Sequence, residues 1–132
     1  MKHYIWAILW ATIILVLCSL PSETTNNVPQ FPGIDKLVHT GFFFVFTILL
    51  YYGAIRRSAN TEPSWSITFR VVSFSTLFAL FTEYIQWKIF TYRSAEAWDL
   101  FADIAGTGMG VFAYLVLTTA VKWTLCREQA TP

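Results

Sequence analysis

The residues best suited to chemistry occur in three short segments, each surrounded by apolar sequence. In chain order, their polar side chains are Asp35, Lys36, His39, Glu83, Gln86, Arg93, Asp99 and Asp103. A histidine with several carboxylates can transfer protons, and the same donors suit a divalent metal ion, although the spacings indicate no particular metal. The catalytic candidates are His39, Glu83 and Asp103, and Asp99 joins them as a candidate metal ligand.

The spacing within each segment places its polar side chains on one face of a helix. Asp35 and His39 are four residues apart, and so are Asp99 and Asp103. Residues three or four positions apart are neighbours on a helix surface. Glu83 and the glutamine three positions after it follow the same rule. We therefore expect three helices, each directing one polar face toward a shared site.

The composition indicates that these helices lie in a membrane. Hydrophobic residues make up 55% of the 132-residue chain and charged residues only 13%, which is about half the usual charged share of a soluble domain. The apolar residues form blocks long enough to cross a bilayer, for which about 20 residues are needed. We predict an all-α membrane protein, a single domain over residues 1–132, with four transmembrane helices at about 4–20, 37–55, 67–90 and 100–123. The first block has no small-residue cleavage site after it, so we expect it to be retained rather than removed as a signal peptide.

Lysine and arginine are more numerous on one predicted side of the membrane. That side holds both termini and the second loop, with Lys2, Arg56, Arg57, Arg70, Lys122 and Arg127. The other side holds Lys36, Lys88 and Arg93. The positive-inside rule therefore places both termini in the cytoplasm. Because successive helices alternate in direction, all three polar segments then meet at the extracytoplasmic face.

Two further features of the spans are a carboxylate inside the third helix and a stripe of small residues on the fourth. Glu83 lies about two turns, roughly 10 Å, inside its predicted helix, where a carboxylate needs a polar partner such as His39, Lys36 or Arg93. Small residues recur every fourth position on the last helix, at Ala102, Gly106 and Gly110. Such a stripe lets helices approach closely, so it predicts a packing seam that holds Asp99 and Asp103 against the other helices.

The three polar segments also resemble the motifs of the VanZ-like family over roughly residues 29–115. The opening motif is Pro32-Gly33-Ile34-Asp35-Lys36-Leu37-Val38-His39, followed by a Phe-rich helix. An E-x-x-Q element, here Glu83-Tyr84-Ile85-Gln86, comes late in the next helix. Arg93 and then Asp99-Leu100-Phe101-Ala102-Asp103-Ile104-Ala105-Gly106, with Gly110, complete the pattern. The family often has Asn where this chain has Asp103, and Gly where it has Tyr92, so this site is more anionic. Extra negative charge favours a cation or a protonated carboxyl.

The resemblance implies a bacterial inner-membrane protein with a role in the cell envelope. The family is named after a protein associated with reduced susceptibility to the glycopeptide teicoplanin, and the resemblance implies no defined reaction. The net charge of +1 gives no reason to expect a nucleic-acid partner.

Three functions remain open at this point. In the first, an outward-facing polar pocket binds membrane lipid, a lipid-linked envelope precursor or a glycopeptide. Lys36 and Arg93 would bind its phosphate or carboxylate, with Trp87, Tyr92 and Trp98 as interface anchors. In the second, the His/carboxylate set, with or without a divalent metal, catalyses a reaction of a lipid phosphate. In the third, the polar residues only clamp the helices together.

Overall fold

The structure is a computed structural model, and it describes residues 2–19, 33–58, 64–89 and 97–130. A short 3-10 helix, η1 (Lys2–Tyr4), leads into α1 (Ile5–Cys18). It is followed by α2 (Ile34–Ser58), α3 (Trp65–Ile89) and α4 (Ala97–Ala130). The described residues form helices and no strand, as the all-α prediction requires.

Helices α2, α3 and α4 begin before the boundaries predicted from hydropathy, whereas α1 ends at Cys18, short of its predicted end. Helix α2 begins before residue 37 and ends after residue 55, and α4 continues past residue 123 to Ala130. The predicted boundaries were placed where the apolar residues stop, but a backbone hydrogen-bond ladder can continue through good helix formers such as arginine. Arg56 and Arg57 in the last turn of α2 also interact favourably with its C-terminal dipole. The predicted ends at residues 20 and 90 lie outside the described residues.

Three of the four predicted spans are supported by length and composition. Helices α2, α3 and α4 are long and apolar enough to cross a membrane. The first helix, Lys2–Cys18, is apolar but shorter than these three. At about 1.5 Å per residue it is roughly 25 Å long, against a hydrocarbon core of about 30 Å. Its crossing of the membrane remains a prediction, as does the orientation of the termini.

Polarity is distributed in the opposite way to that of a soluble protein. Large apolar side chains such as Phe69, Leu77 and Phe112 are exposed on the outer surface. His39 and Asp103 are instead among the buried residues. An outer surface of this kind is covered in lipid and would associate in water, so the distribution fits a membrane environment.

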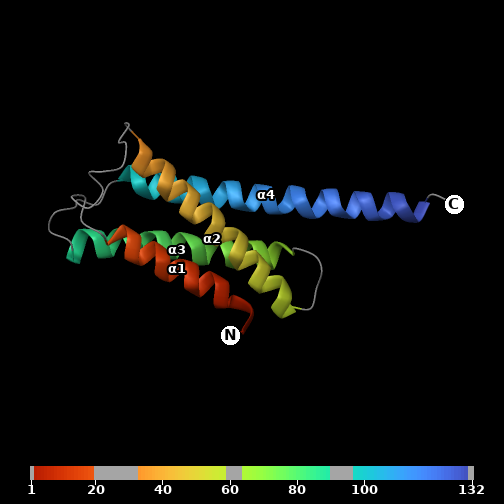
Figure 1. Cartoon of the computed structure of the whole chain (residues 1–132), viewed down its shortest axis with the longest axis horizontal. Coiled ribbons are helices and arrows are strands. Elements are labelled where there is room, and N and C mark those ends of the chain that lie inside the picture. The colour runs from red at the N-terminus through yellow and green to blue at the C-terminus, as the bar shows by residue number, and fades with distance from the viewer. Residues whose placement is uncertain (1, 20–32, 59–63, 90–96, 131–132) are drawn as a thin grey trace.

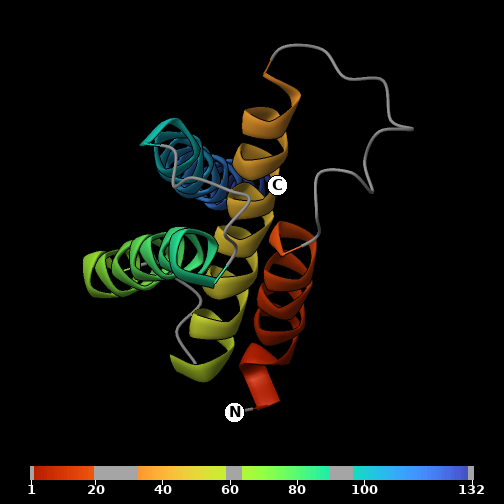
Figure 2. The same cartoon turned by 90° about the vertical axis from the view of Figure 1, so that its left-hand side faces the viewer.

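Helix α2 is the central element of the bundle. It crosses the molecule obliquely, with α1 on one side and α3 and α4 on the other (Figure 1; Figure 2). Gly33, just before α2, has φ of +92°, a conformation that glycine adopts without steric cost. Its carbonyl oxygen accepts a hydrogen bond of 3.1 Å from the Leu37 backbone N–H. This entry places Asp35 in the first turn of α2.

Glycines allow α2 and α4 to come into backbone contact. A Cβ at Gly106 would collide with the Thr40 backbone oxygen, and one at Gly110 would lie 2.8 Å from the Thr47 Cβ. The Thr40 hydroxyl donates a 3.2 Å hydrogen bond across this contact to the Ala102 carbonyl oxygen. The small-residue stripe of α4 therefore faces α2.

Helix α1 is attached to the opposite side of α2 at two points. The Trp10 indole donates a 3.0 Å hydrogen bond to the Phe42 carbonyl oxygen, and the two rings meet edge to face. Near the N-terminus, a Cβ at Gly53 would lie 2.6 Å from the Tyr4 ring. Between these points, small side chains such as Ala7 and Ala11 face the bundle.

Candidate functional site

Two polar pairs connect α2 to α4 near one end of the bundle. The Lys36 ammonium donates a 2.8 Å hydrogen bond to Asp99 Oδ1. About one helical turn further along, His39 Nδ1 and Asp103 Oδ1 share a hydrogen bond of 2.9 Å. The four-residue spacing from Asp99 to Asp103 produces this two-layer arrangement, because it places both carboxylates on the face of α4 that meets α2.

The two layers differ in their access to the surroundings. The outer pair is partly open, with 37% of the Lys36 side chain and 7% of the Asp99 side chain exposed. The inner pair is closed, with His39 at 3% and Asp103 at 0%. The second carboxylate oxygen of Asp103, Oδ2, is buried and has no hydrogen-bond partner among the described residues. A buried carboxylate oxygen without a hydrogen-bond partner is costly, so this oxygen is suited to bind a proton or a cation.

Glu83 of α3 brings a second buried carboxylate to the inner layer. One ligand atom each from His39, Glu83 and Asp103 lie within 4.8 Å of one another. Together these three residues form what we call the inner centre. One imidazole nitrogen and two carboxylate oxygens match the ligand types that divalent transition metals accept. Three protein ligands would leave a coordination position for water or a substrate oxygen.

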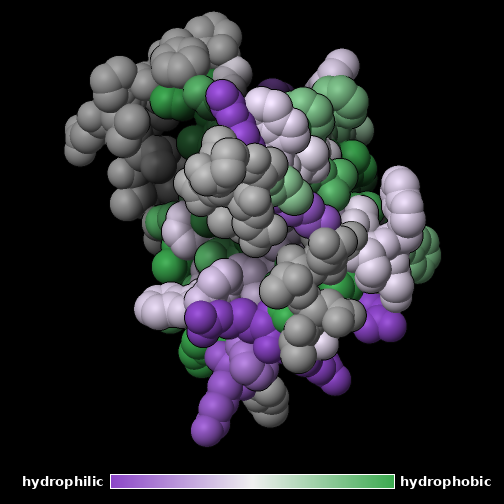
Figure 3. All heavy atoms as spheres, turned by 90° about the vertical axis from the view of Figure 1, so that its right-hand side faces the viewer, coloured by the Kyte–Doolittle hydropathy of each residue, from purple (hydrophilic) through white to green (hydrophobic). Residues whose placement is uncertain are grey.

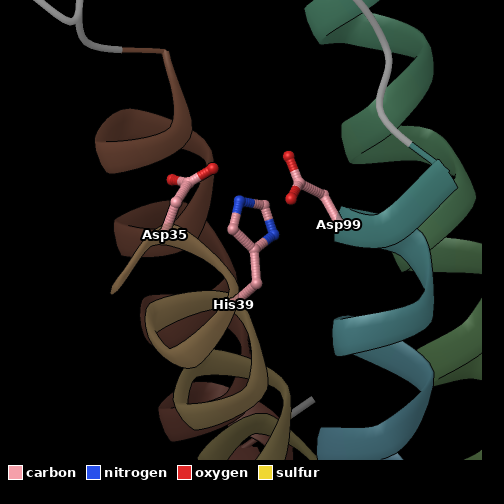
Figure 4. Close-up of side chains that lie close together, drawn as sticks. All are labelled: Asp35, His39 and Asp99. Carbon is pink, nitrogen blue, oxygen red and sulfur yellow. The ribbon is translucent and has the colours of Figure 1, made fainter. Parts of the chain in front are cut away.

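A second group of possible metal ligands lies closer to the end of the bundle. Asp35 and His39 of α2 and Asp99 of α4 also offer ligand atoms within 4.8 Å of one another. Figure 4 shows the His39 ring between the two carboxylates. His39 belongs to both groups, so it connects the inner centre to the partly exposed outer layer.

The other predicted site residues lie apart from the inner centre or outside the described chain. Gln86 donates a 3.3 Å hydrogen bond to the Cys18 carbonyl oxygen, which ties α3 to the end of α1. Arg93 and Tyr92 lie outside the described residues. Trp87 and Trp98 are exposed, as expected of interface anchors.

Three buried hydroxyl groups extend the polar interior below the inner centre. Thr107 donates a 3.0 Å hydrogen bond to the Asp103 carbonyl oxygen, and its oxygen lies 2.8 Å from Ser75 Oγ. Ser75 Oγ lies 3.4 Å from Thr47 Oγ1. This hydroxyl cluster was not predicted from the sequence. Serine and threonine in membrane helices can bond to a neighbouring helix or to their own backbone. Thr118 and Thr119 of this chain bond only within α4. Residue type alone therefore could not show which hydroxyl groups connect two helices.

A groove lies between α2 and α4 beside the outer layer. Its volume is about 360 Å³. It is lined by Gly33, Lys36, Leu37, Thr40, Trp98, Phe101, Ala102 and Ala105. The groove therefore combines apolar and aromatic walls with the Lys36 ammonium.

Three long apolar helices around a polar centre, with a glycine seam between two of them, define a helical membrane protein that has a polar site at one end. The sequence pattern of the VanZ/LLP1 family matches residues 3–118, and the chain belongs to that family. The family predicted from the three polar motifs is thereby confirmed. No curated protein and no solved structure matches the chain.

Proposed function

We propose that this VanZ/LLP1 family protein binds a lipid-linked ligand of the bacterial envelope, through its anionic headgroup, in the groove beside Lys36. The observation that carries this proposal is the composition of that groove, which places one partly exposed ammonium between aromatic and aliphatic walls. An amphiphile has the same division, with a charged headgroup attached to an apolar chain. The binding function is thus favoured over a purely structural one.

Lys36 would bind phosphate or carboxylate as a point charge. The Lys36 ammonium donates a hydrogen bond to Asp99 Oδ1. Asp99 therefore orients Lys36 as well as reducing the net charge of the rim. Trp98 and Phe101, both exposed, would contact the first part of the apolar chain.

We further propose that this end faces outward from the inner membrane, with both termini in the cytoplasm. The excess of basic residues on the other side supports this orientation. An outward site also fits an effect on glycopeptide susceptibility, because glycopeptides act outside the membrane. Single-cysteine labelling with a membrane-impermeant maleimide tests it: the variant Asp35→Cys should react in intact spheroplasts and the variant Arg57→Cys should not. The reverse pattern would refute the orientation.

The binding proposal is tested with purified protein in nanodiscs and a short-chain polyprenyl phosphate as probe. We expect Lys36→Ala to weaken binding about tenfold, equivalent to about 1.4 kcal/mol. Lys88→Ala is the matched control, because Lys88 lies near the same end of the bundle, contacts the Trp87 ring and does not line the groove. Equal dissociation constants for the wild type and both variants would refute the proposal.

A second function, metal-dependent catalysis on a lipid phosphate, is favoured by the inner centre. Its three ligand atoms and the unsatisfied Asp103 Oδ2 fit a divalent cation. When bound, the ion would act as a Lewis acid toward a phosphate oxygen. His39, Glu83 and Asp103 would hold it, and His39 would otherwise serve as general acid or base.

Metal analysis and turnover separate this second function from simple binding. The wild type should retain about one equivalent of a divalent metal after dialysis, and Asp103→Asn should lose most of it, because an amide oxygen is a weaker ligand than a carboxylate. Incubation with a polyprenyl diphosphate should release inorganic phosphate from the wild type alone. Absence of both metal and turnover would exclude the catalytic function.

The structural function makes a different prediction for Glu83. If the polar residues only clamp the helices, Glu83→Gln lowers the stability of the purified protein. The amount of bound probe then decreases only in proportion to the fraction of folded protein. A variant that is as stable as the wild type yet no longer binds the probe would exclude a purely structural role.

A further inference from the structure

A larger groove lies between α1, α2 and α3, away from the polar centre. Its volume is about 670 Å³. Phe46, Leu50 and Ala54 of α2 form its floor, whereas the polar centre uses residues at the other end of that helix. Figure 2 shows α1 and α3 on different sides of α2, and residues of all three helices line the groove. It therefore belongs to neither of the functions proposed above.

Small residues on the inner face of α1 create this space. Ala7 and Ala11 are four residues apart and share one helix face, and both line the groove. Ala54 of α2 lies among the lining residues as well. Phe74 and Phe78 of α3 form the far wall. The lining is thus mainly apolar, and its volume lies within the range of about 300–1,000 Å³ typical of small-molecule sites.

Two arginines give the groove a charged part. Arg57, near the end of α2, and Arg70, in the second turn of α3, both line it and are both exposed. Neither guanidinium has a hydrogen bond or an ion pair with another residue in the described part of the chain. Arg56 differs, because it does not line the groove and its guanidinium carbon lies over the Tyr52 ring, 5.1 Å from the ring centroid.

Figure 3 views the molecule from the side where α2 ends and α3 begins. Hydrophilic residues gather in the lower part of this face, next to apolar surface. A pair of guanidinium groups at the edge of an apolar groove is complementary to a phosphodiester attached to hydrocarbon chains. Guanidinium groups bind phosphate oxygens bidentately, which an ammonium cannot do.

We propose that this groove holds one acyl chain of an anionic phospholipid whose phosphate is bound by Arg57 and Arg70. A second copy of the chain is a poorer occupant, because two copies inserted in the same direction would bring their arginine ends together. The lipid would also fill the space between α1 and α3. It would thereby contribute to holding α1, the shortest of the α-helices, in the bundle.

The charge pattern explains why the lipid should be anionic. The polar centre, with its carboxylates, lies at the other end of α2, so at this end the arginines face no described carboxylate within the groove. If the termini are cytoplasmic, this end lies in the leaflet whose surface potential is negative. The proposal itself does not depend on that orientation, because it follows from the groove and its two arginines alone.

Native mass spectrometry of the full-length protein, delipidated in detergent, tests the proposal. The probes are phosphatidylglycerol and phosphatidylcholine with identical oleoyl chains. We expect the wild type to bind one phosphatidylglycerol with a dissociation constant at least about tenfold below that for phosphatidylcholine. The double variant Arg57→Gln/Arg70→Gln should bind the two lipids equally, and Arg56→Gln should retain the wild-type preference. Equal binding of both lipids by the wild type, or an unchanged preference in the double variant, would overturn the proposal.

Two further measurements identify what occupies the groove. Ala11→Phe places a large side chain into it and should weaken binding of both lipids, while the helix content measured by circular dichroism is unchanged. If this variant does not fold, the arginine variants still decide the question. Inorganic phosphate at about 10-fold molar excess over lipid should not displace phosphatidylglycerol, because phosphate makes none of the acyl-chain contacts in the groove. Displacement by phosphate, or a lipid-free dimer of the wild type that Ala11→Phe abolishes, would each overturn the proposal. Failure of these tests leaves the Lys36 experiment unaffected, because that residue lies in the other groove.

Discussion

Helix α2 meets α4 on one side and α1 on the other, and the two contacts are built differently. Toward α4, glycines bring the backbones together, and the interface contains the two polar pairs Lys36–Asp99 and His39–Asp103. Toward α1, the interface has one indole hydrogen bond and then opens into an apolar groove. In lipid there is no hydrophobic force between helices, so close packing and polar contacts decide how firmly two helices associate. The comparison therefore predicts a firm α2–α4 unit to which α1 is more loosely attached.

The largest effect is expected where the backbones touch. Gly106→Val would drive its side chain into the Thr40 carbonyl, which is backbone and cannot rotate away. We expect this variant to accumulate in membranes at less than about one tenth of the wild-type level, because a clash with backbone is relieved only by separating the two helices, which also breaks the polar pairs between them and costs more than the about 1–3 kcal/mol usual for overpacking. Gly108→Val is the control, since a Cβ there meets nothing within 4 Å. Equal accumulation of both variants, measured by immunoblot, would disprove the close-packed seam.

The next largest effect is expected at the buried pair of His39 and Asp103. His39→Ala removes one partner of Asp103 and leaves a carboxylate in a closed interior, which costs about 3–5 kcal/mol when a buried pair is broken. Replacing both residues with leucine should recover much of that loss, because no charge is then left unpaired. Equilibrium unfolding in mixed micelles measures the free energy of unfolding of the single and the double variant. A double variant no more stable than His39→Ala would contradict this account of the pair.

A smaller effect is expected at the buried hydroxyl cluster. Ser75 lies between Thr47 and Thr107, so Ser75→Ala removes a partner from both hydroxyls. Hydrogen bonds between membrane helices average about 0.6 kcal/mol and reach about 1.7 kcal/mol. We expect Ser75→Ala to lower the free energy of unfolding by about 1 kcal/mol. Thr119→Val, which alters a hydroxyl bonded within α4 alone, should have no measurable effect in the same assay.

The smallest effect is expected on the α1 side. Trp10→Phe removes the hydrogen bond to the Phe42 carbonyl but keeps an aromatic ring in the edge-to-face contact. One such bond contributes about 0.5–1.5 kcal/mol to the free energy of unfolding. The loss should be smaller than this, because the Phe42 carbonyl still accepts its hydrogen bond within α2 and is not left without a donor. The change in stability should therefore fall below that of Ser75→Ala. A loss larger than that of His39→Ala would reverse the ranking of the two interfaces.

Much of the fold was predictable because hydropathy is a local property. The apolar blocks and their polar ends predicted the helices, and the alternation of helix direction grouped the three polar segments. The helix ends were harder, since Arg56 and Arg57 continue α2 although they are not apolar. Whether Lys2–Cys18 crosses the membrane was not decided by hydropathy either, because its length is marginal.

The pairing within the site was not predictable, because it depends on how two helices are rotated and aligned. From the sequence, His39, Lys36 and Arg93 were all suitable partners for Glu83, and Arg93 lies outside the described residues. In the structure, Lys36 bonds to Asp99 and His39 to Asp103. This choice follows from the register of α4 on α2, which the contact between Gly106 and Thr40 determines. No local sequence signal gives that register.

The length of α4 has a consequence for the whole molecule. With 34 residues it is about 51 Å long, well beyond a hydrocarbon core of about 30 Å, and it continues past the rest of the bundle (Figure 1). A helix of this length adapts to bilayer thickness by tilting or by leaving its end in water. Because α4 is joined backbone to backbone with α2, a tilt of one carries the other. The thickness of the membrane would then set how deeply His39 and Asp103 lie below its surface.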